Sequence, residues 1–131
     1  MEVSVGELLD KITILEIKSE RIGDEAKLRN IRRELDSLER TRRTSVPVSE
    51  ALDQLTAQLR EINEKLWEIE DDIRECERQQ DFGEKFVQLA RQVYFTNDQR
   101  SEVKREINKL LGSRLVEEKS YSDYSADGAD C

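Results

Sequence analysis

Histidine is absent from the 131-residue sequence, and proline, glycine and aromatic residues are scarce. The absence of His removes the commonest general base and the commonest transition-metal ligand of proteins. One Pro, five Gly and 5% aromatic residues do not suit a β-rich domain, which needs many turns. The composition therefore favours long helices with solvated faces.

Cysteine and long apolar runs are scarce as well. Cys76 falls on the apolar face of a predicted helix, and Cys131 is the last residue. We expect no disulfide, because the compartment expected below is reducing, and no cysteine nucleophile, because no His is present to activate a thiol. The N-terminus lacks the basic and apolar regions of a secretory signal, and no apolar run approaches the roughly 18 residues that span a bilayer. We expect a cytoplasmic protein that binds no membrane.

Charged residues make up 40% of the sequence, and 22 Lys and Arg against 30 Asp and Glu give a net charge of −8. An acidic surface repels nucleic acid, so we expect no nucleic-acid partner. Nothing in the composition indicates a cofactor. A chain of this length fits one domain with a modest core. We assign residues 1–112 to a single helical domain and residues 113–131 to a polar C-terminal tail.

One stretch organises the predicted fold. Apolar residues between positions 52 and 76 are separated by alternating steps of three and four, which is typical of a helix that packs along its length in a coiled coil. We predict one long helix over residues 49–80, with Ser49 as its N-cap. The apolar residues of this seam are Leu52, Leu55, Leu59, Ile62, Leu66, Ile69, Ile73 and Cys76.

The other segments also carry helix signals. The first helix begins at a capping box, residues 4–7, and reaches about residue 22. The second reaches about residue 43, and Asp24 is available as its N-cap. A fourth helix follows a second capping box, residues 81–84. A fifth, which ends at Gly112, is either separate from the fourth or continuous with it. We expect four apolar residues of the fourth helix to face inward: Phe82, Phe86, Leu89 and Val93.

Short connections and apolar faces predict the topology. Because about five residues join the second and third helices, we expect the second to fold back antiparallel on the third. The arrangement that we predict is an antiparallel hairpin of the first and second helices against the third, with the fourth and fifth helices returning along it. The first helix is apolar on two sides, since Ile14 and Ile17 point away from Leu8 and Leu9. It is either sandwiched in the bundle or at a dimer interface, and we favour a homodimer through Ile14 and Ile17. The fold class is all-α: an elongated antiparallel helical hairpin or bundle with a coiled-coil-like long helix.

Three strings of the sequence are familiar together. They are VGELLDKITILEIK at residues 5–18, NEKLWEIED at residues 63–71, and NDQR at 97–100 followed by KREIN at 104–108. On these strings the chain resembles a family of short bacterial proteins catalogued as domain of unknown function 6165. The resemblance covers nearly the whole length, including EEKSY at residues 117–121. It implies a small helical protein without an assigned activity, and it supplies no catalytic residues.

Polar and charged residues fall on or beside the apolar faces of the predicted helices. An unpaired buried charge is costly, so we expect these groups to meet each other, water or a ligand. Glu16 lies within the apolar arc of the first helix. Arg100 and Lys104 lie on the apolar face of the predicted fifth helix. The candidate site consists of seven residues: Glu16, Asn63, Trp67, Glu70, Asn97, Arg100 and Lys104.

Two interpretations of this candidate site remain open. In the first, the seven residues form a polar network that fixes helix register. The protein is then a non-enzymatic interaction or scaffold module, with itself or another protein as its partner. In the second, the two cations hold a small anionic ligand, the two amides orient it, Trp67 covers it and Glu70 serves as acid or base. The lack of His and of a nucleophile signature favours the first interpretation.

A metal site is a weaker alternative. Glu7 and Asp10 on the first helix, and Glu68 and Asp71 on the third, each make an acidic pair three residues apart. Two such pairs facing one another could hold Mg²⁺ through carboxylate oxygens, as the all-helical nucleoside triphosphate pyrophosphohydrolases do. Because 30 of the 131 residues are acidic, pairs at this spacing are expected by chance. A solvated face is the simpler interpretation.

Overall fold

A computed structural model describes residues 4–112, which form four α-helices. They are α1 (Val5–Arg21), α2 (Glu25–Ser45), α3 (Glu50–Gln79) and α4 (Glu84–Leu110). The prediction of an all-α bundle is confirmed, and no strand occurs within the described residues. None of these four helices is long and apolar enough to cross a membrane. The predicted polar tail, residues 113–131, lies outside the described residues.

The N-termini of three helices carry the predicted side-chain caps. Ser4, Asp24 and Ser49 each accept a hydrogen bond from a backbone N–H in the first turn of α1, α2 and α3. The capping box predicted at residues 81–84 does not form. Asp81 accepts instead from the N–H of Gly83, two residues on, and α4 begins without a side-chain cap.

α4 joins the predicted fourth and fifth helices into one. The polar residues 96–98 do not interrupt it, because the helix contains no Pro or Gly and because Thr96 is buried on its inner face. The helix ends at Leu110. Gly112 follows with a φ of +57°, the left-handed conformation expected of a glycine just beyond a helix C-terminus.

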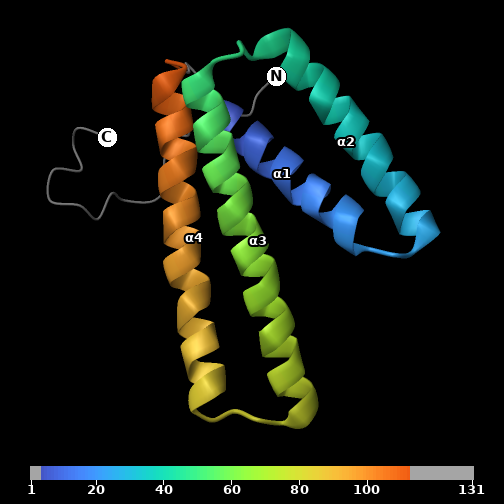
Figure 1. Cartoon of the computed structure of the whole chain (residues 1–131), viewed down its shortest axis with the longest axis vertical. Helices are drawn as coiled ribbons and strands as arrows, with labels where there is room; N and C mark the ends of the chain where they lie inside the picture. The colour runs from blue at the N-terminus through green and yellow to red at the C-terminus, as the bar shows by residue number, and fades with distance from the viewer. Residues whose placement is uncertain (1–3, 113–131) are drawn as a thin grey trace, which may run out of the picture.

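α3 and α4 lie side by side as a long hairpin, in which the chain passes along α3 and returns along α4 (Figure 1). α1 packs against both of them, and α2 makes its close helix contact with α1. The first two helices pack on one another and the last helix returns along α3, as predicted, but the prediction that the second helix packs on the third is wrong. Because α1 is apolar on two sides, it lies between α2 and the α3–α4 hairpin, whereas α2 has one apolar face to bury.

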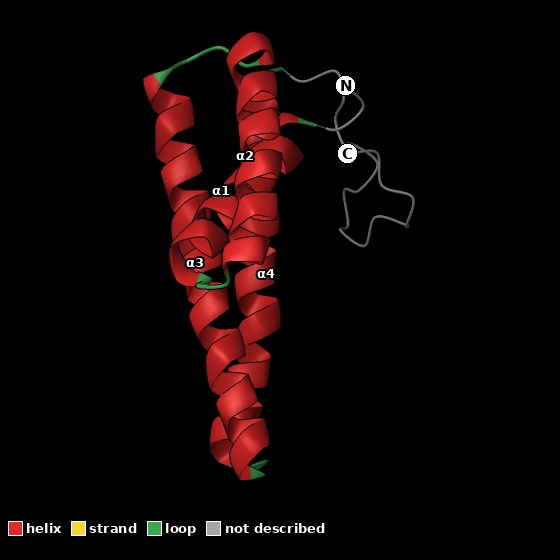
Figure 2. Cartoon of the chain, turned by 90° about the vertical axis from the view of Figure 1, so that its right-hand side faces the viewer, coloured by secondary structure: helices red, strands yellow, loops and turns green. Residues whose placement is uncertain are grey.

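The core lies where α1 meets α3 and α4, and it contains the fully buried Leu9, Leu59 and Ile107. The predicted apolar seam of α3 is confirmed, since all eight of its residues are buried or half-buried. Away from this core, the far ends of α3 and α4 extend beyond α1 and α2 (Figures 1 and 2). There Phe82, predicted to face inward, is 51% exposed, because it lies in the connection before α4 and not on the inner face of that helix.

The second apolar side of α1 is used within the chain. Ile17 is 1% exposed, and Ile14 is half-buried. α1 is thus sandwiched in the bundle, which was one of the two possibilities for a helix that is apolar on both sides. The homodimer interface predicted at Ile14 and Ile17 keeps only the half-buried Ile14, because a single chain already buries Ile17.

Candidate functional site

A buried carboxylate is the centre of the polar interior. The side chain of Asp10 on α1 is 5% exposed. Arg100 of α4 binds it through two N–H groups, with Nε 3.0 Å from Oδ1 and Nη2 2.6 Å from Oδ2. Asn63 of α3 donates to Oδ1 at 2.9 Å, and Lys104 Nζ lies 3.9 Å from Oδ2. One carboxylate therefore joins three helices.

The cations of this network are neutralised by side chains of the same chain. Arg100 also donates from Nη1 to Asn97 Oδ1 at 3.2 Å, and Lys104 forms an ion pair with Glu7. Hydrogen bonding to Asp10 raises the pKa of Arg100 above its ordinary value, although desolvation by burial opposes the shift. A guanidinium held in this way has little capacity left for a bound anion.

A close backbone contact sets the position of α1 on α4. The N–H of Gly6 donates to Asn108 Oδ1 at 2.8 Å. A Cβ at Gly6 would lie 2.6 Å from the carbonyl oxygen of Lys104, so only glycine allows this approach. Asp10 follows one turn later on the same side of α1, which brings its carboxylate to Arg100.

The structure brings four of the seven predicted site residues into the network around Asp10. Glu16 lies elsewhere: it is half-buried and accepts a hydrogen bond from Arg60 of α3 at 3.2 Å. Arg60 also binds Glu20, and this hydrogen bond raises the pKa of Arg60. The four residues of the network are Asn63, Asn97, Arg100 and Lys104.

Glu70 and Trp67 lie outside the network. Glu70 was placed in the interior by the prediction, but its side chain is 53% exposed and pairs at 3.6 Å with Arg74 of the same helix. That placement was wrong, because the position borders the apolar seam of α3, where solvent reaches the side chain. Trp67 is half-buried, with the guanidinium carbon of Arg21 6.0 Å from its ring centroid.

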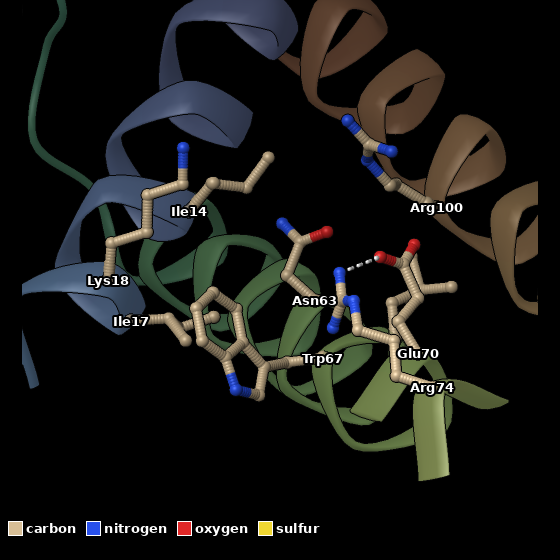
Figure 3. A pocket seen from close by; sticks show the side chains of 9 residues that line it. Ile14, Ile17, Lys18, Asn63, Trp67, Glu70, Arg74 and Arg100 are labelled. Carbon is tan, nitrogen blue, oxygen red and sulfur yellow. Dashed lines mark ion pairs between the residues drawn. The ribbon is translucent and has the colours of Figure 1, made fainter. Parts of the chain in front are cut away.

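A pocket of about 380 Å³ opens beside the network, between α1, α3 and α4 (Figure 3). Trp67 and Ile17 lie together on one side of it, and Arg100 and Arg74 lie on the other. Both arginines are paired with carboxylates, but Lys18 has no ion-pair partner among the described residues. The remaining lining residues are Ile14, Asn63, Leu66 and Glu70.

The four carboxylates considered for Mg²⁺ are not gathered into one site. Glu7 and Asp10 contact the cations of α4, Glu68 pairs with Arg21 at 2.8 Å, and Asp71 pairs with a cation of its own helix. Within residues 4–112, no group of three or more Cys, Asp or Glu side chains is arranged to hold a metal ion.

Sequence reasoning missed Asp10 as the centre of the polar interior and considered it only as a metal ligand on a solvated face. A signal was present. Gly6, Asp10, Thr13 and Ile17 follow one another at steps of four, three and four, so Asp10 lies on the second apolar strip of α1. The buried Asn108 lies four residues after Lys104, on the same face of α4.

These features define an all-α protein, in which residues 4–112 form four helices and three of the helices share an interior ion-pair network. The model of the family of unknown function DUF6165 matches residues 1–128, and the chain belongs to that family. The resemblance seen in three sequence strings is thereby confirmed. No curated protein and no solved structure matches the chain. Family membership assigns no activity.

Proposed function

We propose that this protein is a non-enzymatic interaction module, a cytoplasmic helical scaffold that binds a protein partner through the outer face of α4. The observation that carries the proposal is an exposed aromatic pair on that face. Tyr94 and Phe95 are 54% and 50% exposed, and their rings stack with centroids 4.8 Å apart. Aromatic side chains grouped in this way on a surface are typical of the centres of protein interfaces.

The state of the interior supports the same proposal. The cations expected to hold an anionic ligand, Arg100 and Lys104, are bound to Asp10 and Glu7. Such an arrangement suits a network that holds helices in register. Glu70, the residue suggested as acid or base, is exposed and paired with Arg74. The polar interior therefore favours a structural role over a catalytic one.

Site-specific photo-crosslinking tests the proposal in the cells that produce the protein. A photoreactive phenylalanine analogue replaces Tyr94 in one variant and Asn30, an exposed residue of α2, in the control. We expect a discrete cross-linked species from position 94 and none from position 30. The proposal fails if neither position gives a species, or if both give the same diffuse products. The mass of the species distinguishes a second copy from another protein.

A second candidate function rests on the pocket beside the network. Lys18 is unpaired among the described residues, and Ile14, Ile17, Leu66 and Trp67 provide apolar walls. A small carboxylate with an apolar body would fit, with Lys18 rather than Arg100 or Lys104 as its cation. This proposal keeps the small anionic ligand of the second interpretation but assigns its binding to a different cation beside the network.

A thermal-shift screen tests this second function. The probes are aliphatic and aromatic carboxylates and nucleotides, each with and without Mg²⁺. A ligand at a hundred times its dissociation constant stabilises the fold by about 2.7 kcal/mol, a rise of several degrees in Tm. We expect Lys18→Met to abolish any such shift and the control Lys27→Met, on α2, to leave it intact. A screen without shifts leaves the interaction module as the function.

A further inference from the structure

We infer that the partner of α4 is a second copy of this chain, packed antiparallel about a two-fold axis that passes between Tyr94 and Phe95. This inference rests on the interaction module proposed above and names its partner. It also relocates the homodimer expected from the sequence, because Ile17 is buried within the chain and Ile14 is half-buried.

The proposed interface is a single exposed stripe, here called the outer stripe of α4. Its residues recur at steps of three and four, so they share one face, opposite the buried face that contains Val103 and Ile107. The stripe is about 30 Å long at 1.5 Å per residue. Its residues, all of them exposed, are Glu84, Val87, Arg91, Tyr94, Phe95, Asp98, Ser101, Glu102 and Arg105.

Charge complementarity selects the second copy and its direction. About an axis between residues 94 and 95, Arg91 lies opposite Asp98 of the second copy, and Glu84 lies opposite Arg105. Two-fold symmetry repeats each pair, so every one of these charges meets an opposite charge. In a parallel pair each residue would face its own copy, and Arg91 would meet Arg91. Arg105 contacts Glu102 within its helix, but both side chains are exposed and free to rearrange.

The centre of the stripe is apolar and already ordered. The rings of Tyr94 and Phe95 are inclined at 28° to one another, and the guanidinium carbon of Arg91 lies 5.7 Å from the Phe95 ring centroid. At the two-fold axis this cluster meets the same cluster of the second copy, and Val87 lies opposite Glu102 at its edge. An apolar centre with a charged rim is the usual anatomy of a protein interface.

Sedimentation equilibrium of the full chain tests this pairing. Two helices of this length bury less than the roughly 1,600 Å² of a standard interface, so we expect a reversible dimer that dissociates on dilution. From low to several hundred micromolar protein, the mean mass should rise from 15.3 kDa toward twice that value. Protein that stays monomeric overturns the inference.

Charge reversal tests the antiparallel register. Arg91→Asp and Asp98→Arg each place like charges opposite one another, and each should weaken the dimer by about tenfold or more. The double variant with both changes should return the dissociation constant to within about threefold of the original value. Residues 91 and 98 are two turns apart, about 10 Å along the helix, so this rescue cannot arise within one chain.

Arg33→Asp on α2 is the matched control, because it makes the same charge change at an exposed residue away from α4. We expect it to leave the dimer unchanged, and circular dichroism verifies the fold of every variant. Failure of the double variant to restore the dimer overturns the inference, and so does equal weakening by the control. A cross-link from position 94 to a different protein would overturn the self-pairing while supporting the interaction module.

Discussion

Removing Arg100 should destabilise the fold more than removing both partners of its ion pair. Arg100→Met leaves the carboxylate of Asp10, 5% exposed, with Asn63 at 2.9 Å and Lys104 at 3.9 Å as its remaining donors. Loss of one partner from a buried pair costs about 3–5 kcal/mol, because the other charge stays buried. Since Lys104 remains near, we expect about 3 kcal/mol, a large part of the roughly 5–15 kcal/mol that stabilises a domain.

The double variant Asp10→Asn with Arg100→Met should recover part of this loss. It removes both charges of the pair and leaves Lys104 with Glu7, and the new amide oxygen can still accept from Asn63. We therefore expect the double variant to be more stable than Arg100→Met alone, with a coupling energy of about 2 kcal/mol between positions 10 and 100.

Urea unfolding followed by circular dichroism measures both effects, provided that the m-value is the same for all variants. The control is Arg74→Met, which removes an arginine whose side chain is 62% exposed. Exposed ion pairs of this kind contribute at most about 1 kcal/mol. If Arg100→Met costs no more than Arg74→Met, or if the two changes of the double variant simply add, the carboxylate of Asp10 does not hold the three helices together.

Two further substitutions, each with a matched control, test the backbone geometry. Gly6→Ala should cost about 2 kcal/mol in the free energy of unfolding, because its Cβ would press on the carbonyl oxygen of Lys104. Gly23→Ala, whose Cβ meets open space, should change stability by less than about 1 kcal/mol. Gln80→Gly should stabilise by about 1 kcal/mol, because Gln80 adopts a φ of 56° that glycine tolerates better. Gln79→Gly, within α3, should instead destabilise by about 1 kcal/mol, and thermal unfolding measures all four.

Much of the secondary structure was predictable because its signals are local. The alternating apolar steps between Leu52 and Cys76 and the cap at Ser49 lie within the helix that they define. The capping box at residues 81–84 failed because Asp81 had a competing local acceptor role, toward Gly83. The sequence permits both the capping box and the hydrogen bond from Gly83, and it does not indicate which of the two forms.

The candidate site was predictable only in part, for a related reason. Helical phase placed Asn63 and Arg100 toward the interior, because the face on which a residue lies can be worked out from the sequence of its own helix. It misplaced Glu70, which lies at the edge of its apolar face, where a small rotation of the helix decides between core and solvent. It also left Asp10 without its partner, since Arg100 is 90 residues away in the chain.

The sequence by itself determined that this protein is all-helical, where most of its helices begin and end, and which face of each is apolar. Only the tertiary structure decided which faces meet: α2 away from α3, Ile17 inside the chain, and Asp10 against Arg100. The physical reason is that hydrophobic burial has no direction, so an apolar stripe shows that a face is covered without naming what covers it. The partner follows from three-dimensional fit, such as the close approach of α1 to α4 that Gly6 permits.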